Sequence, residues 1–541
     1  MLAGLVLMCP APTLGQPQNP PAADQPELPQ IRSLRIEGVS VYTANELQQR
    51  LRLVPGARLP GRPEDIAREI ERRYARDGYT FARAQVSIDD AGVLTIHVDE
   101  GQIDDIELRG VSAEVAARLR TAFPIQIGDV FNQMQATRAL EEALEFTHGA
   151  IEPAPGRIFM LDRDQGRNVL LVFLRTRRTR SGVFVGTQDR EDWYSPVDGF
   201  APAVGFQSTI FDTKRFNHSY WAGYISYKFA AARAGYTFGF ERPFFADGVL
   251  QAGASIHDLT GSDDRWRLSD LEQSLVAFGF RNTFRDYYGR KGLQLHAALR
   301  PLARHEWMVA WRDESHRSLV NETDFGLFRD EDAFRPNQAA LEGDLHALLV
   351  GYTFDSSGLA EQPPDQRYRR HLVDDFFATV SNREQGSRID WRSEFAPAAF
   401  DGDFDFSRHI LNARTWVQMP PRRVIGARVL AGFSDGELPP QRVFALGGIG
   451  SVHGYRFKEV AGDRMILLNG ELRQRVGPAG MAGLVFIDAG RVGGPLPGST
   501  GEWLTGVGVG AEFAGARVEF GWRMDDIPRS LQVLFRLSRT F

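Results

Sequence analysis

Gly447-Gly448-Ile449-Gly450-Ser451-Val452-His453-Gly454-Tyr455-Arg456-Phe457 is the stretch that decides the fold of this chain of 541 residues. It is rich in glycine and lies between runs in which apolar and polar residues alternate. Phe486-Ile487-Asp488-Ala489-Gly490 ends a later alternating run, and the chain closes on an aromatic residue, Phe541. Any one of these pieces could equally be an ordinary hairpin loop or strand. The pattern of the residues around them therefore decides the interpretation.

Alternation dominates the chain from Thr179 to Phe541, where no helical periodicity is seen. The run from Ala516 to Met524, for example, places Val518, Phe520 and Trp522 on one face and charged residues on the other. Such runs are about 10 to 13 residues long, enough to span a bilayer when tilted. Because bacterial barrels prefer an even number of strands, the pattern predicts an all-β transmembrane barrel of sixteen antiparallel strands. Residues 303–400 leave two strand counts open.

Counting strands from the C-terminus gives the side on which each loop lies. The last strands are predicted near 531–541, 515–524, 502–513, 480–490, 465–476 and 422–433. The loop from Ser434 to Arg464 then precedes five strands and is an outer loop. In the strand that ends at Gly490, Val485 and Ile487 share one face. If that face meets lipid, Asp488 points into the lumen.

The N-terminal residues divide into an export leader and a linker. Residues 1–16 have the apolar core of a signal peptide but no preceding Lys or Arg, and residues 17–30 are rich in proline. The only cysteine, Cys9, lies in the leader, so we expect no disulfide in the mature chain.

No run of 18 apolar residues occurs, which excludes a helical membrane protein. The net charge of −6 argues against nucleic acid as a partner.

Residues 31–178 contain an internal repeat. Ile31 to Ser40 matches Ile103 to Ser112, and each copy begins with a short strand that ends in Gly-Val. In the first copy Ile66, Ile70 and Tyr74 form one apolar stripe on a charged helix that starts at a proline. The pattern predicts two α+β domains, at 31–101 and 102–178, each of strand–helix–helix–strand–strand order.

These residues together resemble a known superfamily. Ile36-Glu-Gly-Val39 and Leu108-Arg-Gly-Val111 resemble the openings of POTRA domains. Val452-His453-Gly454-Tyr455 looks like the loop motif of the bacterial surface antigen superfamily, which includes BamA, TamA and the two-partner secretion transporters. Phe486, Asp488 and Gly490 match its strand motif, and Phe541 its C-terminal assembly signal. The resemblance runs from Ile31 to Phe541.

The resemblance implies a role for the loop motif and shows one departure from the family. In the family an arginine of this loop reaches into the lumen and meets the strand-motif aspartate, here Asp488. His453 stands at that position, and a histidine is only partly charged near neutral pH. We therefore expect a His453–Asp488 contact that is weaker or pH-dependent. The alternative is that Asp488 pairs with a lumenal arginine such as Arg473 or Arg517.

The resemblance also implies the function and the location. It indicates a protein of the bacterial outer membrane with POTRA domains in the periplasm, where it assembles or translocates unfolded client proteins. The expected partners are these clients, the lipid bilayer and periplasmic chaperones or accessory proteins. A two-partner secretion pore for one large protein and a passive outer-membrane channel stay open as alternatives. Opening between the first and last strands would let a client strand pair with an exposed edge.

Other chemistry finds little support in the sequence. His305-Glu306 lacks the second histidine of a zinc-protease motif, and the histidines show no spacing suited to a metal. Neither a Gly-x-Ser-x-Gly elbow nor a phosphate loop occurs. We therefore expect no enzymatic activity, no metal and no cofactor. The charged residues of the last strands are more typical of a lumenal network than of a catalytic set.

Overall fold

The computed structural model describes residues 28–537, except 148, 165, 187–190, 213–216, 246–248, 329–332, 360–384, 477–479 and 495–500. The chain separates into two compact units, one of which comprises residues up to Glu145 together with Glu152–Arg175, and the other most of the remainder. We describe each unit by itself. The expected leader, with Cys9, and the terminal Phe541 lie outside the described residues.

The first repeat folds in the predicted order of strand, two helices and two strands. Its elements are β1 (Ser33–Glu37), α1 (Ala44–Leu51), α2 (Pro63–Arg76), β2 (Arg83–Ile88) and β3 (Val93–Asp99). The strands form one sheet in the order β1-β3-β2, in which β1 and β3 are parallel. The apolar stripe of Ile66, Ile70 and Tyr74 on α2 is buried, so α2 covers the sheet and closes the core.

The second repeat has the same start and a longer strand region. Its elements are β4 (Asp105–Arg109), α3 (Ala113–Ala122), α4 (Gln133–Leu144), β5 (Ile151–Pro153), β6 (Phe159–Asp164) and β7 (Arg167–Thr176). The central strand β7 pairs in parallel with β4 and antiparallel with β6. One strand more than predicted is present, because β5 and β6 both pair with β7. The exact domain limits stay a prediction.

The repeated Gly-Val has one physical cause in both copies. Gly38 and Gly110 have φ values of +77° and +89°, and a Cβ on them would lie 2.2 and 1.9 Å from the carbonyl oxygens of Val98 and Leu174. The first strand of each repeat therefore ends against the backbone of the last strand. Only glycine fits there, both for its conformation and for its size.

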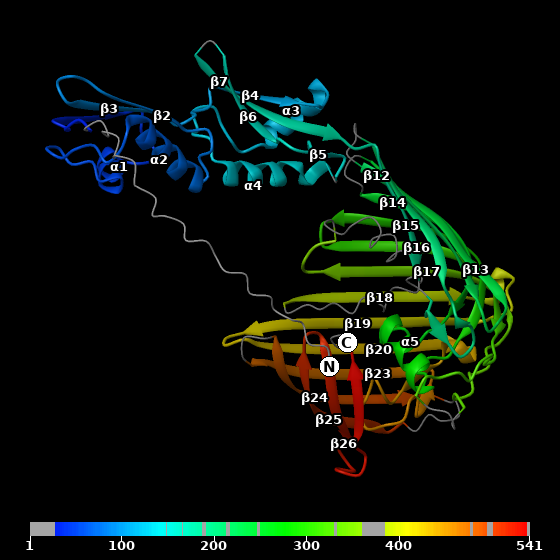
Figure 1. Cartoon of the computed structure of the whole chain (residues 1–541). Helices are drawn as coiled ribbons and strands as arrows, with labels where there is room; N and C mark the ends of the chain where they lie inside the picture. The colour runs from blue at the N-terminus through cyan, green and yellow to red at the C-terminus, as the bar shows by residue number, and fades with distance from the viewer. Residues whose placement is uncertain are drawn as a thin grey trace, which may run out of the picture. The chain divides into compact units, whose positions relative to one another are not determined.

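The second unit is built on one antiparallel sheet of sixteen strands, as predicted. The sheet curves strongly from the strands drawn in green to those in red (Figure 1). The strands in order are β8 (Thr179–Gly186), β11 (Ala203–Asp212), β12 (Asn217–Lys228), β13 (Arg233–Phe244), β14 (Leu250–Gly261), β15 (Tyr288–Leu302), β16 (His305–Ser318), β17 (Gly343–Asp355), β18 (Gly386–Ala396), β19 (Phe406–Met419), β20 (Arg423–Gly436), β23 (Arg464–Val476), β24 (Met481–Gly493), β25 (Trp503–Phe513), β26 (Ala516–Arg523) and β27 (Gln532–Arg536).

Alternation along these strands separates two faces of the sheet. On β24 Val485 and Ile487 are 52% and 54% exposed, whereas Phe486 and Asp488 are 5% and 3% exposed. On the other strands too, large apolar residues are exposed on one face and arginines and carboxylates are buried on the other. The exposed apolar face suits lipid and the charged face suits a lumen, and Asp488 lies on the buried, charged face.

One expectation for this unit is wrong. Helical periodicity was expected to be absent after Thr179, but α5 (Asp270–Phe280) is a regular helix within a loop of residues 262–287. Ser269-Asp-Leu-Glu272 forms a capping box at its start, which is a helix signal visible in the sequence. The described residues of 303–400 contribute β16, β17 and β18 to the sheet. No helix among the described residues is both long and apolar enough to cross a membrane.

The glycine contact in the first repeat makes a prediction with a control inside the same domain. Gly56 also has a positive φ, +92°, but a Cβ there would meet nothing within 4 Å. Gly38→Ala should destabilise the domain by about 2 kcal/mol or more, because strain and overpacking act together, whereas Gly56→Ala should cost about 1 kcal/mol. Hydrogen exchange of β1 and β3 in the full chain measures both. Equal effects would show that contact with Val98 is unimportant.

Candidate functional site

The quoted stretch lies in a loop of residues 437–463 that connects β20 to β23, which we call the inserted loop. Two short strands within it, β21 (Phe444–Leu446) and β22 (Val460–Gly462), pair with each other. Ser451 and Val452 between them are fully buried, and His453 is 5% exposed. Because buried lumenal residues of several strands surround these side chains, the tip of the loop lies inside the curve of the sheet.

His453 is held between two carboxylates of different strands. Its Nδ1 lies 2.6 Å from Asp488 Oδ2 on β24, and its Nε2 lies 3.3 Å from Glu519 Oε2 on β26. The backbone N–H of His453 also donates to Asp488 Oδ2 at 3.3 Å. The side-chain amide of Asn469 donates to the other oxygen, Asp488 Oδ1, at 2.7 Å. Thus both oxygens of Asp488 have a hydrogen-bond donor.

The two contacts define the charge of the His453 ring. A neutral imidazole carries a single N–H, whereas both nitrogens of an imidazolium donate. Two carboxylates, one at each nitrogen, are therefore matched only by the doubly protonated ring. Burial between two anions makes His453 a cation at the position where the family has arginine. The departure from the family pattern thus preserves the charge.

The alternative partners of Asp488 pair elsewhere. Arg473 lies 3.5 Å from Glu512, and Arg517 lies 2.6 Å from Glu471 and 3.0 Å from Glu519. The structure therefore brings together His453 and Asp488, the pair that the resemblance implied. Phe486 joins the same contact, because its ring centroid lies 4.4 Å from that of His453.

Glycines of the strands leave the space that the loop tip occupies. A Cβ on Gly490 would lie 2.7 Å from Leu446 Cδ1, and one on Gly506 would lie 2.7 Å from the carbonyl oxygen of His453. A Cβ on Gly521 would lie 2.6 Å from His453 Cβ. The glycine of the strand motif, Gly490, therefore has a packing role: a side chain there would force Leu446 of the inserted loop to move.

Gly454 and Tyr455 connect the loop to the last strands. Gly454 has φ +85°, and a Cβ on it would lie 2.2 Å from the backbone nitrogen of Arg523. Its own N–H donates to Gln532 Oε1 of β27 at 3.3 Å, and Gln532 Nε2 donates to the carbonyl of Tyr455 at 3.4 Å. The hydroxyl of Tyr455 accepts from the N–H of Thr505 on β25 at 3.2 Å. The motif thus contacts β24, β25, β26 and β27.

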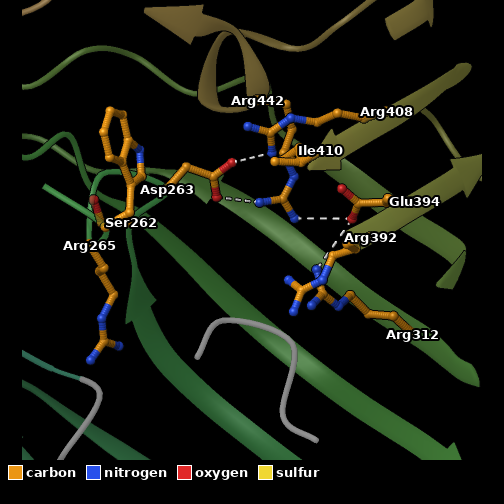
Figure 2. A pocket seen from close by; sticks show the side chains of 10 residues that line it. Ser262, Asp263, Arg265, Arg312, Arg392, Glu394, Arg408, Ile410 and Arg442 are labelled. Atoms are coloured by element: carbon orange, nitrogen blue, oxygen red, sulfur yellow. Dashed lines mark hydrogen bonds and ion pairs between the residues drawn. The ribbon is translucent and has the colours of Figure 1, made fainter. Parts of the chain in front are cut away.

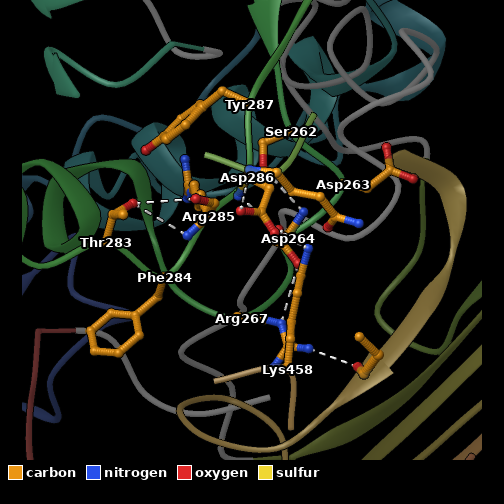
Figure 3. Close-up of polar contacts among 12 residues, drawn as sticks. Ser262, Asp263, Asp264, Arg267, Thr283, Phe284, Arg285, Asp286, Tyr287 and Lys458 are labelled. Atoms are coloured by element: carbon orange, nitrogen blue, oxygen red, sulfur yellow. Dashed lines mark hydrogen bonds and ion pairs between the residues drawn. The ribbon is translucent and has the colours of Figure 1, made fainter. Parts of the chain in front are cut away.

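Residues 262–287 hold the inserted loop from the other side. Arg267 donates to the carbonyls of Ala445 and Gly447, at 2.7 and 3.1 Å. Lys458 lies 2.7 Å from both Asp264 and Asp286 (Figure 3). Burial alone would raise the pKa of Asp286, but Lys458 and Arg335 hold it below the usual value of an aspartate. These ion pairs fix two loops that are far apart in sequence against each other.

A small cavity lies beside this junction and is rich in arginine. Arg265, Arg312, Arg392, Arg408 and Arg442 line it from separate elements (Figure 2). Asp263 bridges Arg408 and Arg442 at 2.6 and 2.5 Å, and Glu394 lies 3.3 Å from both Arg312 and Arg442. Its volume of about 30 Å³, measured as space for the centres of water molecules, is enough for ordered water. The arrangement fits a lumenal charge network.

The described residues contain no group of three or more metal-ligating side chains placed to hold an ion. The expected absence of a metal, a cofactor and catalysis stays a prediction.

The structure brings most of the predicted site residues together, namely Val452, His453, Gly454, Tyr455, Phe486, Asp488 and Gly490. The remaining one, Phe541, lies outside the described residues. Glu519 was expected to be lumenal without a partner being assigned. The sequence analysis did not predict the contacts of Gln532, Arg267 and Glu272. A signal existed only for Glu272, which is part of the capping box of α5.

The two units define a class of protein: modular α+β domains followed by an antiparallel barrel with a loop folded into its lumen. Family models agree with this class. Residues 29–101 match the POTRA model, described as a surface antigen variable number repeat, and residues 375–540 match the Omp85 superfamily domain. The chain therefore carries a POTRA domain and an Omp85 barrel domain, which confirms the resemblance. It is an outer-membrane protein whose POTRA domain lies in the periplasm.

Two solved structures match most of the chain. BamA from Haemophilus ducreyi lacking POTRA domains 1–3 is 14% identical with a TM-score of 0.45, over 94% of this chain and 98% of that one. CdiB from Escherichia coli is 16% identical with a TM-score of 0.37, over 96% and 91%. No curated protein matches the chain.

A first prediction concerns the glycine of the loop motif. Gly454→Ala should expel the loop tip or block assembly of the barrel, because the new Cβ would meet the backbone of β26. Gly515→Ala is the matched control, since Gly515 has φ +88° and open space around its Cβ position. Heat-induced unfolding of the purified protein, followed as a gel-mobility shift, should show a loss for Gly454→Ala alone. Similar losses would contradict close packing at Gly454.

A second prediction concerns the pair that locks the loop. His453→Ala and Asp488→Ala should each destabilise the barrel by about 3–5 kcal/mol, because each leaves a buried charge without its partner. The double variant should cost much less than the sum, with a coupling energy of at least about 1 kcal/mol. His453→Arg should retain most of the stability. Additive effects in unfolding measurements would rule out the contact.

Proposed function

We propose that this protein inserts client proteins into the outer membrane through an opening between its first and last strands. Family membership gives the coarser function, protein insertion or secretion at the outer membrane. The observation that supports insertion is the state of the two terminal strands. Among the described residues, β8 and β27 stand at the two ends of the sheet and do not pair with each other. We call the boundary between them the seam.

Both edges of the seam are suited to strand exchange. All residues of β8 are exposed, with Val183 and Val185 at 77% and 82%. On the other edge β27 pairs with β26 over only five residues, whereas β24 and β25 pair over ten. Unpaired backbone groups are costly in lipid, so an extended client strand is the natural partner for these edges.

Client docking has a candidate site in the periplasmic unit. A cavity of about 440 Å³ is lined by residues next to two edge strands, β2 of the first repeat and β6 of the second. Its lining includes Phe81, Phe131 and Phe159, and Arg83, Arg157 and Arg163, but no carboxylate. An extended client segment with apolar and acidic side chains matches this lining in shape and charge.

The alternatives differ in what they require of the chain. A two-partner secretion pore shares the fold and two POTRA-like domains but would need a continuous path through the lumen. The inserted loop and residues 262–287 instead pack in buried clusters with inward-facing residues of the strands. A passive channel would need the same path. Insertion at the seam requires no such path, and this favours it.

The test is proteomic analysis of outer membranes and culture supernatant after depletion of the protein. We expect several outer-membrane barrel proteins to decline, because each depends on insertion at the seam. Loss of one large secreted protein with an intact outer membrane would instead support the secretion pore. Unchanged proteomes together with ion conductance of the purified protein in planar bilayers would support the passive channel.

A further inference from the structure

We infer that α5 is a latch on the seam, and that Glu272 holds the end of the final strand away from strand partners. The inference rests on the proposed function and concerns the regulation of that same seam. It comes from contacts between α5, which belongs to an outer loop, and residues Arg536 and Leu537 at the end of β27. Nothing in the loop motif or the strand motif requires these contacts.

The carboxylate of Glu272 is fully occupied and serves two purposes. Its Oε2 accepts from the backbone N–H and hydroxyl of Ser269, at 2.9 and 2.8 Å, and so completes the capping box of α5. Its Oε1 accepts from the backbone N–H of Leu537 at 2.6 Å and from Arg536 Nε at 3.2 Å. Glu272 is 3% exposed, so these bonds lie in a dry environment where they are strong.

The hydrogen bond between Leu537 and Glu272 occupies a backbone donor of the last strand. In a sheet a backbone N–H donates to the neighbouring strand, but the N–H of Leu537 donates to a side chain. Pairing of β27 with β26 ends at Arg536, the residue before it. The first amide beyond the paired stretch of β27 is therefore taken by Glu272.

Further contacts fix β27 to the same segment. The side chain of Arg536 donates through Nη2 to the carbonyl of Arg267 at 3.2 Å. Leu534 of β27 is buried in a cluster with Leu268 and with Ile449 of the inserted loop. The residues before α5 thus pack on the lumenal side of the strand, and Glu272 binds Arg536 and Leu537 at its end.

The opposite face of α5 contacts the other side of the seam. The N–H of Tyr194 donates to Ser274 Oγ of α5 at 3.5 Å, and Tyr194 packs with Ala277 in a buried cluster. Tyr194 belongs to the loop that follows β8. Arg285 links the two segments again, because it lies 2.7 Å from both Asp192 and Asp270. A single helix therefore contacts β27 and the segment that follows β8.

This geometry has a consequence for client entry. Strand pairing of β27 that extends beyond Arg536 must take over the N–H of Leu537, which requires release of Glu272. Because α5 also contacts the loop after β8, release on one side loosens the bridge across the seam. Client binding and opening of the seam are thereby coupled through one carboxylate.

The test compares Glu272→Ala with Ser269→Ala in the full chain in lipid nanodiscs. Ser269→Ala removes the helix cap but leaves both bonds of Glu272 to β27, so it is the matched control. Hydrogen–deuterium exchange of the peptide that contains Leu537 is the measurement. We expect exchange of this amide to rise roughly tenfold or more in Glu272→Ala, and to change little in Ser269→Ala.

The outcomes separate the latch from a mere helix cap. Unchanged exchange in a folded Glu272→Ala, or equal increases in both variants, would overturn the inference. If Glu272→Ala does not fold, Glu272→Gln replaces it, because the amide keeps the size of the side chain and one acceptor oxygen. A smaller rise in Glu272→Gln then supports the latch, and no rise overturns it.

A client-insertion assay on the same variants separates the inference from the proposed function. Faster exchange at Leu537 with insertion unaltered would leave the latch in place and contradict insertion at the seam. Normal exchange in Glu272→Ala with intact insertion would remove the latch and leave the proposed function standing. Faster exchange together with an altered insertion rate would support both.

Discussion

The buried contact of His453 with Asp488 and Glu519 is the interaction on which the rest of the barrel depends. It places one cation between two carboxylates from two strands, where each charge needs the others to offset the cost of burial. The cation lies on a loop, so forming the contact draws that loop into the lumen. The strand glycines that surround it are explained by the same event, because each leaves the space of a side chain for the loop.

The inserted loop also organises the last strands. Gln532 of β27 accepts a hydrogen bond from the N–H of Gly454 and donates one to the carbonyl of Tyr455, and Arg267 and Lys458 bind the inserted loop to residues 262–287. The final strand is thus held by side-chain contacts from the lumen as well as by pairing with β26 over five residues. The loops hold such a strand while they are in place. Few backbone hydrogen bonds must break, however, to release its edge. This combination is what a reversible seam requires.

Much of this could be predicted from the sequence, because the relevant patterns are local. Alternation gave the sixteen strands and placed Asp488 on the lumenal face, and the repeated Gly-Val identified the two N-terminal domains. The contacts of Glu272, Arg267 and Gln532 could not be predicted in this way. Each joins segments far apart in the chain, and a charged residue in a loop gives no sign of which strand it will meet. The helix α5 was missed although its capping box was visible, because a single short helix was outweighed by the β pattern around it.

The central claim is that client strands enter at the seam, and site-specific photocrosslinking tests it most directly. A photoreactive residue placed at Val185 of β8 or Phe535 of β27 lies at an exposed edge of the seam, whereas one at Val429 of β20 is exposed in the middle of the sheet. The account predicts adducts with outer-membrane client proteins at Val185 and Phe535, and none at Val429. Adducts of equal yield at all three positions, or lipid adducts alone, would contradict it.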